Sequence, residues 1–349
     1  MVTRLVAIFA AAACLGTVPG IATDARADER RIATLAPEGS LWLEDMERGA
    51  TEIRKLTKGR ITVKFYAGGS QGDERDVIRK MRLEQLDGAA LTSIGLGMIY
   101  PGIRVLELPF LWESVDEIDY VRKKMWPYFE EKFAEEGFTL LAAGDVGWVH
   151  LFSANPIESV DDLEAARMWA WTDDPIVRKL FKLMKLDGVP LGVPAVLAGL
   201  QSGRINACYG SPLAAVALQW HTQVNYMSDE PVGYGLAGMV MRTDVWESAS
   251  AKDREIQVDV GRKRMKKSIE RIRRDNKRAL KAMLKNGMKV LELPPEFETE
   301  LRKQALALRE KMAGDLYTQA ELDMVLEYRD EYRAKQGENR KVARGVTAE

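Results

Sequence analysis

The N-terminal third of the chain alternates between strand-like and helix-like spacing of apolar residues. In ITVKFYAGG the side chains of Ile61, Val63 and Phe65 share one face of a strand that ends at two glycines. The segments on either side, 40–58 and 73–88, carry apolar residues at helical spacing, and short apolar strands precede and follow them. This order of strand, helix, strand, helix and strand predicts a parallel sheet wrapped by helices, with ligands at the carboxyl ends of its strands.

A second unit of the same kind begins near FTLLAAGDVGW. RMWAW and GVPLGVP are strand-like, TDDPIVRKLFKLMKLDG between them is helical, and GYGLAGMVMRT is a further strand. VLELPFLW is predicted as a strand or loop broken by Pro109, and from about Ser250 nearly every segment is helical apart from ELPPEF. Two α/β units predict two lobes with a cleft between them, an arrangement that often closes on a ligand by a hinge.

The N-terminus predicts export from the cytoplasm. Arg4 precedes an apolar run, and an A-R-A motif follows as a small-x-small cleavage site, so residues 1–27 are interpreted as a secretory signal peptide and the mature protein as periplasmic. A lipid anchor at Cys14 is the less favoured alternative, because alanine stands where a lipoprotein signal usually has leucine.

The composition gives no support for catalysis or for nucleic-acid binding. The net charge is −1, and the two histidines, His150 and His221, have no Cys or His partner at metal-ligand spacing. Cys208 remains alone once residues 1–27 are removed, which excludes a disulfide, and no nucleophile-elbow or phosphate-loop motif is present. Acid pairs such as Asp173-Asp174 are interpreted as helix N-terminal charge. We therefore expect no enzyme activity, no cofactor and no metal site.

The short segment DDLEAARMWAW places two indoles close together. On a strand, Trp169 and Trp171 point to the same face, while Met168 and Ala170 point to the other. A core layer is one interpretation, since buried aromatic residues are common. A wall of the cleft is the other.

Several stretches together resemble the extracytoplasmic solute receptors of tripartite ATP-independent periplasmic (TRAP) transporters, the DctP-like proteins. They are LAPEGSLW, TKGRITVKFYAGGSQGDERDVIRKM, LELPFLW, NPIESVDDLEAARMW and VLAGLQSGRINACYGSP, in the order that the family has them. The resemblance implies an α/β two-lobed periplasmic solute-binding protein fold with a hinge and long C-terminal helices. It also implies a receptor that traps a small solute, usually an organic acid, and delivers it to a permease of small and large membrane subunits. The expected lobes are residues 28–144 with about 235–275, and 145–234 with about 276–349.

The sequence departs from the family at the residues that bind the ligand carboxylate. Laid on the family pattern, Trp169 takes the place of an arginine that forms a bidentate salt bridge to the acid. Trp148, or His150 in another register, takes the second basic position. An indole offers one N–H donor and an apolar face, and an unpaired buried carboxylate costs several kcal/mol. We therefore expect a neutral, apolar or aromatic solute rather than a simple carboxylate, with a cationic ligand as an alternative.

Further ligand contacts are expected from the family positions. They are Glu74 after the glycine-rich turn, Thr92 and Ser93 at a strand end, Phe110 in the LPF segment, and Tyr209 and Ser211 after the GRIN turn. Two alternatives remain open for the indoles: Trp171 as a core residue, and Trp169 as a plug in a cleft that no longer binds a ligand. Arg167 would restore a guanidinium only through a register slip.

The segment 262–285 carries twelve lysines and arginines but only two acids. Such a run on a long helix is usually a solvated face, and contact with anionic lipid or with an acidic permease surface is the alternative. A second function class is a periplasmic carrier or sensor of lipid-like ligands that reuses the fold without driving import.

Overall fold

The computed structural model describes residues 28–343. The strands are β1 Asp28–Thr34, β2 Ile61–Tyr66, β3 Gly88–Thr92, β4 Phe138–Ser153, β5 Met168–Trp171, β6 Gly188–Leu191, β7 Ala207–Gly210, β8 Tyr226–Ser228, β9 Gly233–Arg242 and β10 Lys289–Leu291. The α-helices are α1 Leu41–Leu56, α2 Glu74–Arg82, α3 Ser93–Ile99, α4 Val115–Glu135, α5 Val160–Ala165, α6 Pro175–Met184, α7 Val196–Gln201, α8 Pro212–Ala217, α9 Thr243–Ser248, α10 Ala251–Lys285, α11 Pro295–Met312 and α12 Gln319–Ala343. Short 3-10 helices are η1 Pro101–Glu107, η2 Val193–Ala195 and η3 Trp220–Thr222. The proposed signal peptide and its Cys14 lie outside the described residues.

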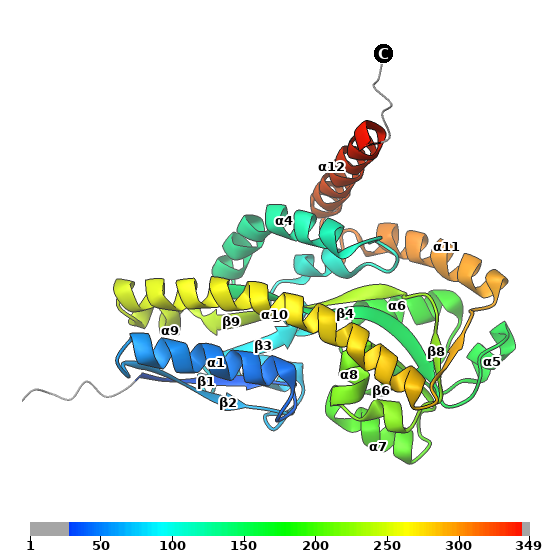
Figure 1. The fold of residues 1–349 in the computed structure, drawn as a ribbon, viewed down its shortest axis with the longest axis horizontal. Helices are drawn as coiled ribbons and strands as arrows, with labels where there is room; N and C mark the ends of the chain where they lie inside the picture. The colour runs from blue at the N-terminus through cyan, green and yellow to red at the C-terminus, as the bar shows by residue number, and fades with distance from the viewer. Residues whose placement is uncertain (1–27, 344–349) are drawn as a thin grey trace, which may run out of the picture.

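Two lobes share the long strand β4 (Figure 1). The first lobe is built on the order β2-β1-β3-β9-β4, in which β1 pairs in parallel with β2 and β3. The second lobe continues from β4 through β7, β5 and β6, and β5 is parallel to both of its neighbours. The parallel pairing predicted for the first three strands and the two-lobed α/β fold are therefore confirmed, but the sheet is mixed, because β9 is antiparallel to β3 and β4, and β4 is antiparallel to β7.

Three continuous elements cross from one lobe to the other. They are β4, β9 and the 35-residue helix α10, which runs across both lobes in Figure 1. The boundaries proposed from the sequence, at 144, 235 and 275, each fall inside one of these elements. The β4–β9 ladder has a register shift between Asp145 and Gly147, where Gly147 has a φ of +120°. A side chain at Gly147 would meet Asn276 of α10 at 2.6 Å, so the close approach of helix and strand there requires glycine.

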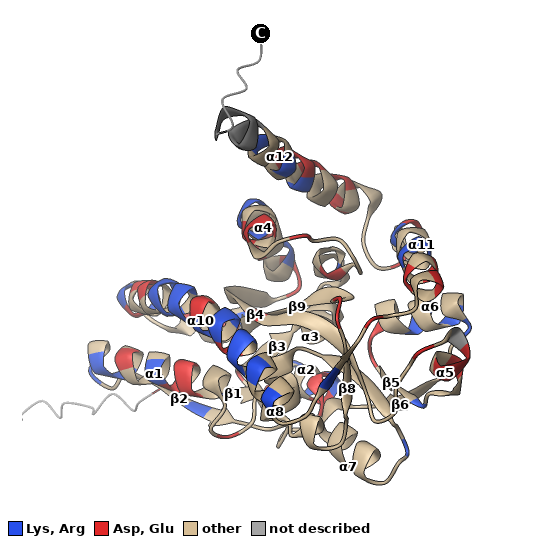
Figure 2. Ribbon diagram, turned by 45° about the vertical axis from the view of Figure 1, so that its right-hand side comes forward, with Lys and Arg blue, Asp and Glu red and all other residues tan. Residues whose placement is uncertain are grey.

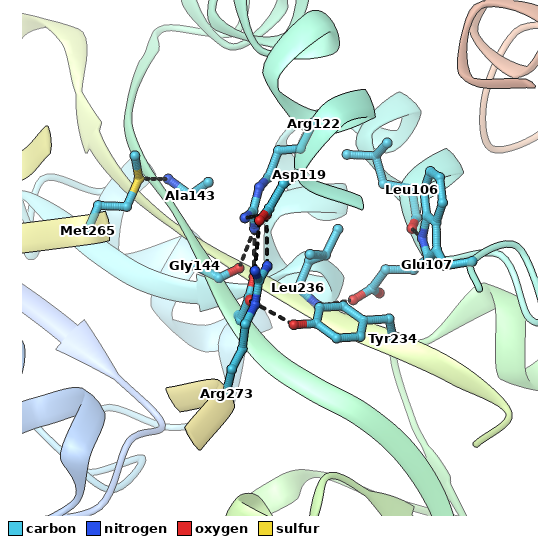
Figure 3. Close-up of polar contacts among 12 residues, drawn as sticks. Leu106, Glu107, Asp119, Arg122, Ala143, Gly144, Tyr234, Leu236, Met265 and Arg273 are labelled. Atoms are coloured by element: carbon cyan, nitrogen blue, oxygen red, sulfur yellow. Dashed lines mark hydrogen bonds and ion pairs between the residues drawn. The ribbon is translucent and has the colours of Figure 1, made fainter. Parts of the chain in front are cut away.

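A buried charge network fills this crossing point. The carboxylate of Asp145, which is fully buried, accepts hydrogen bonds from Arg122 of α4 at 2.6 Å, Arg273 of α10 at 2.7 Å and the Tyr234 hydroxyl at 2.6 Å. Figure 3 shows the two arginines converging from opposite helices, with Asp119 between them. Asp119 accepts from both guanidinium groups at 2.6–2.7 Å, so each arginine has two carboxylate partners.

The main hydrophobic core lies on one side of the first sheet. Phe129 and Phe133 of α4 pack there with Leu140 and Val240 of the sheet, and all four are at most 4 % exposed. Helix α12 packs on α4 and extends away from the rest of the molecule (Figure 1). The helical C-terminal region predicted from the sequence is confirmed, although the short strand β10 interrupts it.

One of two alternatives is decided and one local prediction was wrong. VLELPFLW, predicted as a strand or a loop, is not a strand, because its first residues belong to η1 and Phe110 has a φ of +54°, a left-handed conformation that breaks an extended run. Ser93 was wrongly placed at the end of a strand: β3 ends at Thr92, whose hydroxyl accepts from the N–H of Ile94 and caps α3.

Candidate functional site

One continuous hollow of about 500 Å³ begins where the carboxyl ends of strands from both lobes meet. Thr92 at the end of β3 lines it from the first lobe, and Trp171 and Tyr209 line it from the ends of β5 and β7. The volume lies in the range of about 300–1,000 Å³ typical of small-molecule pockets. A cavity therefore lies where the cleft was predicted.

Aromatic rings form one wall of this cleft. Trp169 stacks on Tyr209 with a centroid distance of 4.7 Å and on Trp171 at 5.8 Å, and the ring of Trp220 meets its edge at 5.2 Å. The Trp169 indole N–H donates to the backbone oxygen of Leu191 at 2.9 Å. Because the fold uses this donor and the side chain is 2 % exposed, Trp169 offers the cavity no hydrogen bond and only a small apolar surface.

Trp171 joins the two lobes. Its indole N–H donates to the carboxylate of Asp73 in the first lobe at 3.0 Å, and the backbone N–H of Val193 donates to the same oxygen at 3.2 Å. Asp73 also caps helix α2, and burial raises the pKa of its carboxyl group. A surface ion pair between Arg75 and Asp173 lies beside it. These contacts hold the lobes together around the cleft.

A buried ion pair also bridges the lobes. Arg104 of η1, 2 % exposed, donates to Asp174 of the second lobe at 3.0 Å, and its Nε lies 3.4 Å from the carboxylate of Glu107. Asp174 is at the same time the N-cap of α6, since it accepts from the N–H groups of Ile176 and Val177. Burial raises the pKa of Glu107, which also accepts a backbone N–H bond. The guanidinium in this cleft is therefore already neutralised.

Glu74 is buried beside the cleft and is committed to the fold. Its carboxyl oxygens accept from the N–H and the hydroxyl of Thr92 at 2.6 and 2.8 Å and from the N–H of Gly95 at 2.6 Å. Burial nevertheless raises the pKa of Glu74 to about 8. At neutral pH this carboxyl group is therefore mostly protonated.

The raised pKa of Glu74 predicts a pH dependence of stability. Between its ordinary pKa of 4.5 and about 8, the folded protein holds a proton that the unfolded chain has lost. Stability then falls as pH rises through this window, by up to about 1.4 kcal/mol per pH unit. Urea unfolding of the wild type and of Glu74→Leu at pH 5 and pH 8 measures it, and the wild type should lose more stability. A relative gain at pH 8 would mean that the three hydrogen bonds keep Glu74 ionised.

The other predicted site residues are divided between the cavity and its surroundings. Ser211 lines the hollow and caps α8, so its hydroxyl serves the helix. Phe110 lines the hollow further along, where the guanidinium of Arg302 lies 4.4 Å from its ring centroid. Ser93 is fully buried next to the cleft, and its hydroxyl has no hydrogen-bond partner among the described residues.

Trp148 and His150 do not form a wall with Trp169, contrary to the expectation. Trp148 packs edge-to-face on Tyr234 at 5.0 Å, and His150 is held by the backbone oxygen of Ser228 at 2.9 Å. Neither lines the hollow, whereas Val149 and Leu151 do, because successive side chains of β4 point to opposite faces. The register slip considered for Arg167 is also excluded, since its exposed guanidinium bonds the oxygen of Gly203.

The fold and the site together define a class of protein: a two-lobed receptor that holds a small solute between its lobes. The profile of the family described as DctP, bacterial extracellular solute-binding protein, family 7, matches residues 32–315, and the chain belongs to this family. It is a TRAP solute-binding receptor, extracytoplasmic by family and not an enzyme.

The relatives include a solute-binding protein of Chromohalobacter salexigens, 26% identical over 249 residues, which are 70% of this chain and 74% of the relative. A Bordetella pertussis receptor, DctP7, that binds pyroglutamic acid has a TM-score of 0.80 at 18% identity, over 86% of this chain and 99% of its own. A Xanthobacter autotrophicus receptor with bound β-D-galacturonate has a TM-score of 0.79 at 19% identity, with the same coverage.

Residues 28–343 lack two further features. No group of His, Cys, Asp and Glu residues in this part of the chain is arranged to hold a metal ion. None of its helices combines the length and the apolar character that crossing a bilayer needs.

Proposed function

We propose that this receptor binds a neutral, largely apolar or aromatic solute in the cleft and passes it to a TRAP permease of small and large membrane subunits. The observation that carries the proposal is the state of the positive charges around the hollow. Among the described residues that line it, Arg104 and Arg264 are cationic, and each has carboxylate partners. A carboxylate ligand would have to displace one of these partners or remain unpaired, at a cost of several kcal/mol.

The aromatic wall supports the same solute class. Trp169 and Trp171 line the hollow but are only 2 % and 6 % exposed, so the half-buried ring of Tyr209 offers the larger apolar surface to a ligand, worth roughly 25 cal/mol per Å² buried. A solute that contacts this wall and the first lobe together stabilises the closed form through its differential affinity. The galacturonate and pyroglutamate of the similar structures belong to a different chemical class.

Isothermal titration with indole as a neutral aromatic probe, and with D-galacturonate and pyroglutamate as acids, tests the proposal. The wild type should bind indole and neither acid. Tight binding of either acid in the cleft would overturn the assignment of solute class.

Asp174→Asn should increase the affinity of the receptor for acidic ligands. Asparagine keeps the helix N-cap but removes the closer of the two carboxylates that pair with Arg104, leaving the 3.4 Å contact to Glu107, so one side of the guanidinium becomes available to a ligand carboxylate. We expect affinity for D-galacturonate or pyroglutamate to rise at least tenfold in the same titration. Asp173→Asn, which removes the neighbouring surface pair, is the matched control and should bind the acids no better than the wild type.

A further inference from the structure

The two faces of the first sheet are packed differently. On the side of α4, inward side chains of β9 such as Leu236 and Val240 are buried. On the side covered by α1 and α10, the alternate residues Ala237 and Met239 are only half-buried, as is Phe65 of β2. Protein interiors are normally close-packed, so a covered sheet face with half-buried apolar residues encloses unfilled space. We call this space the sheet chamber; it is lined by Ile32, Met46, Ile53, Phe65, Met239 and Met265.

The sheet chamber is the inner part of the hollow that begins in the cleft. At the cleft, Thr92 of β3 lies opposite Ala237 of β9, and further in Ala90 lies opposite Met239. These residues alternate along their strands, so they share one face of the sheet, and each of them lines the hollow. On β9 the lining continues to Met241, which lies roughly 14 Å from Ala237 at about 3.4 Å per residue. The hollow therefore leads from the cleft along the sheet.

Both covering helices carry a glycine deep in the sheet chamber. Trp42 of α1 donates its indole N–H to the backbone oxygen of Asp145 at the crossing point of the lobes, and Gly49 lies roughly 10 Å further along α1. Gly261 of α10 lies about one turn before Met265 on the same lining. A Cβ atom added at either glycine would meet nothing within 4 Å. Since glycine weakens a helix relative to alanine, two open glycines keep the space free at a cost to the fold.

The outer seam of the sheet chamber, between α1 and α10, is held by ion pairs. Glu52 of α1 accepts from Lys263 at 3.0 Å and from Arg264 at 2.6 Å. Arg271 donates to Asp45 at 2.8 Å. Figure 2 shows the basic residues of α10 beside the acidic residues of α1. Because these charges are already paired, the apolar lining decides what the chamber holds, and methionine-rich apolar cavities accept apolar guests.

Polar groups of the hollow gather at its cleft end. Glu107 accepts from the backbone N–H of Leu236 at 2.6 Å, which is the strand position next to the start of the passage. The Nε of Arg104 lies 3.4 Å from this carboxylate, is buried, and has no hydrogen-bond partner among the described residues. The hydroxyl of Tyr209 accepts from the N–H of Trp171 at 3.2 Å, and the described part of the chain offers its proton no acceptor. A ligand hydroxyl, which both donates and accepts, suits unused donors beside a carboxylate.

We propose that the hollow binds one neutral amphiphile with a straight apolar chain, its hydroxyl head at Tyr209 and Arg104 and its chain in the sheet chamber. The proposal rests on the proposed function and names the solute class: long-chain alcohols and related neutral lipids. At the cleft end a carboxylate head would meet Glu107 and Asp174, and an ammonium head would meet Arg104, so a neutral head is favoured. The chain gains by burying its apolar surface along the whole passage.

Titration of the purified protein with decanol, followed by tryptophan fluorescence, tests the proposal, since Trp42 and Trp171 both line the hollow. Butanol is the head-only probe, and decanoate has the same chain with a charged head. Decanol should bind at least a hundredfold more tightly than butanol and at least tenfold more tightly than decanoate. Failure of decanol to bind, or equal binding of decanol and decanoate, would overturn the proposal. If indole still binds and the acids do not, the proposed function stands without it; tight binding of D-galacturonate or pyroglutamate would remove both.

Gly261→Leu fills the deep end of the sheet chamber. It should weaken decanol at least tenfold but hexanol less than threefold, because the shorter chain does not reach this end. Ala50→Leu provides a second chamber-filling variant should Gly261→Leu not fold. Gly337→Leu is the matched control, because Gly337 is also an open glycine on a helix, on α12 outside the hollow, and it should change neither affinity. If the chamber-filling variants bind decanol like the wild type, the chain lies elsewhere and the proposal fails.

Tyr209→Phe tests the position of the head. It should weaken hexanol and decanol by the same factor, at least fivefold, because both alcohols use the same hydroxyl contact. Tyr226→Phe removes a hydroxyl of β8 outside the hollow and is the matched control, which should change neither affinity. Wild-type affinity of Tyr209→Phe for both alcohols, or an equal loss of hexanol and decanol in Gly261→Leu, would mean that the head does not lie at the cleft end, and the proposal would be wrong.

Discussion

Replacing Trp169 by alanine should lower the free energy of unfolding by about 3–5 kcal/mol, the cost typical of removing a large buried aromatic side chain. The indole is 2 % exposed, packs on three aromatic rings and bonds the backbone oxygen of Leu191. The same change should abolish indole binding, because it removes the centre of the aromatic wall. Urea unfolding and isothermal titration measure the two effects.

Trp126→Ala is the matched control for this substitution. Trp126 lies on α4, is only half-buried and donates its indole N–H to the exposed Glu130. It should cost about 1 kcal/mol and leave indole binding intact. Trp169→Phe keeps a stacking ring and should retain part of the affinity. A Trp169→Ala protein that binds indole like the wild type would show that this residue belongs to the core and not to the site.

Asp145→Ala should cost about 3–5 kcal/mol, because it removes the fully buried carboxylate that two partly buried guanidinium groups share and leaves them only the more exposed Asp119. Arg122, Arg273 and the Tyr234 hydroxyl all donate to Asp145, which is fully buried where β4 crosses between the lobes. Guanidinium groups do not give up their proton, so they cannot escape the cost by becoming neutral. The urea midpoint of the variant should fall accordingly.

Asp119→Ala tests whether the burial of a carboxylate or the number of its ion pairs determines the stability of this network. Asp119 pairs with the same two arginines, but its side chain is 41 % exposed, so water can replace it. Its loss should cost less than half as much as the loss of Asp145. Equal losses would mean that the number of ion pairs, and not their burial, sets the stability of the crossing point.

Much of the fold follows from local patterns in the sequence. The alternation at Ile61, Val63 and Phe65 and the helical spacing around it gave the parallel sheet of the first lobe, and Trp169 and Trp171 do share a face. The segment around Phe110 was missed because a left-handed residue and a 3-10 helix leave no periodic signal. Strand β10 was missed because three residues are too few to show a periodic pattern.

The cleft was only partly predictable, because its polar residues come from segments far apart in the chain. Arg104 is a single charge between Ile103 and Val105. This pattern indicates a buried charge that needs a partner, but it does not identify the partner residue. Asp174 was correctly interpreted as helix N-terminal charge, yet its bond to Arg104 depends on the packing of the two lobes. Trp148 was placed in the cleft by motif position alone, whereas the strand register turns it toward Tyr234.

The thiol of Cys208 lies in the core of the second lobe, and burial raises its pKa to about 12. A thiol that is both inaccessible and protonated does not react with maleimide reagents at neutral pH. It is also the sole cysteine in the described part of the chain. One cysteine introduced on the exposed surface of each lobe, such as at Lys64 and at Arg204, could therefore carry a donor and an acceptor dye without background labelling. Residues 28–343 are in this way already suited to measuring the distance between the lobes of single receptors by energy transfer.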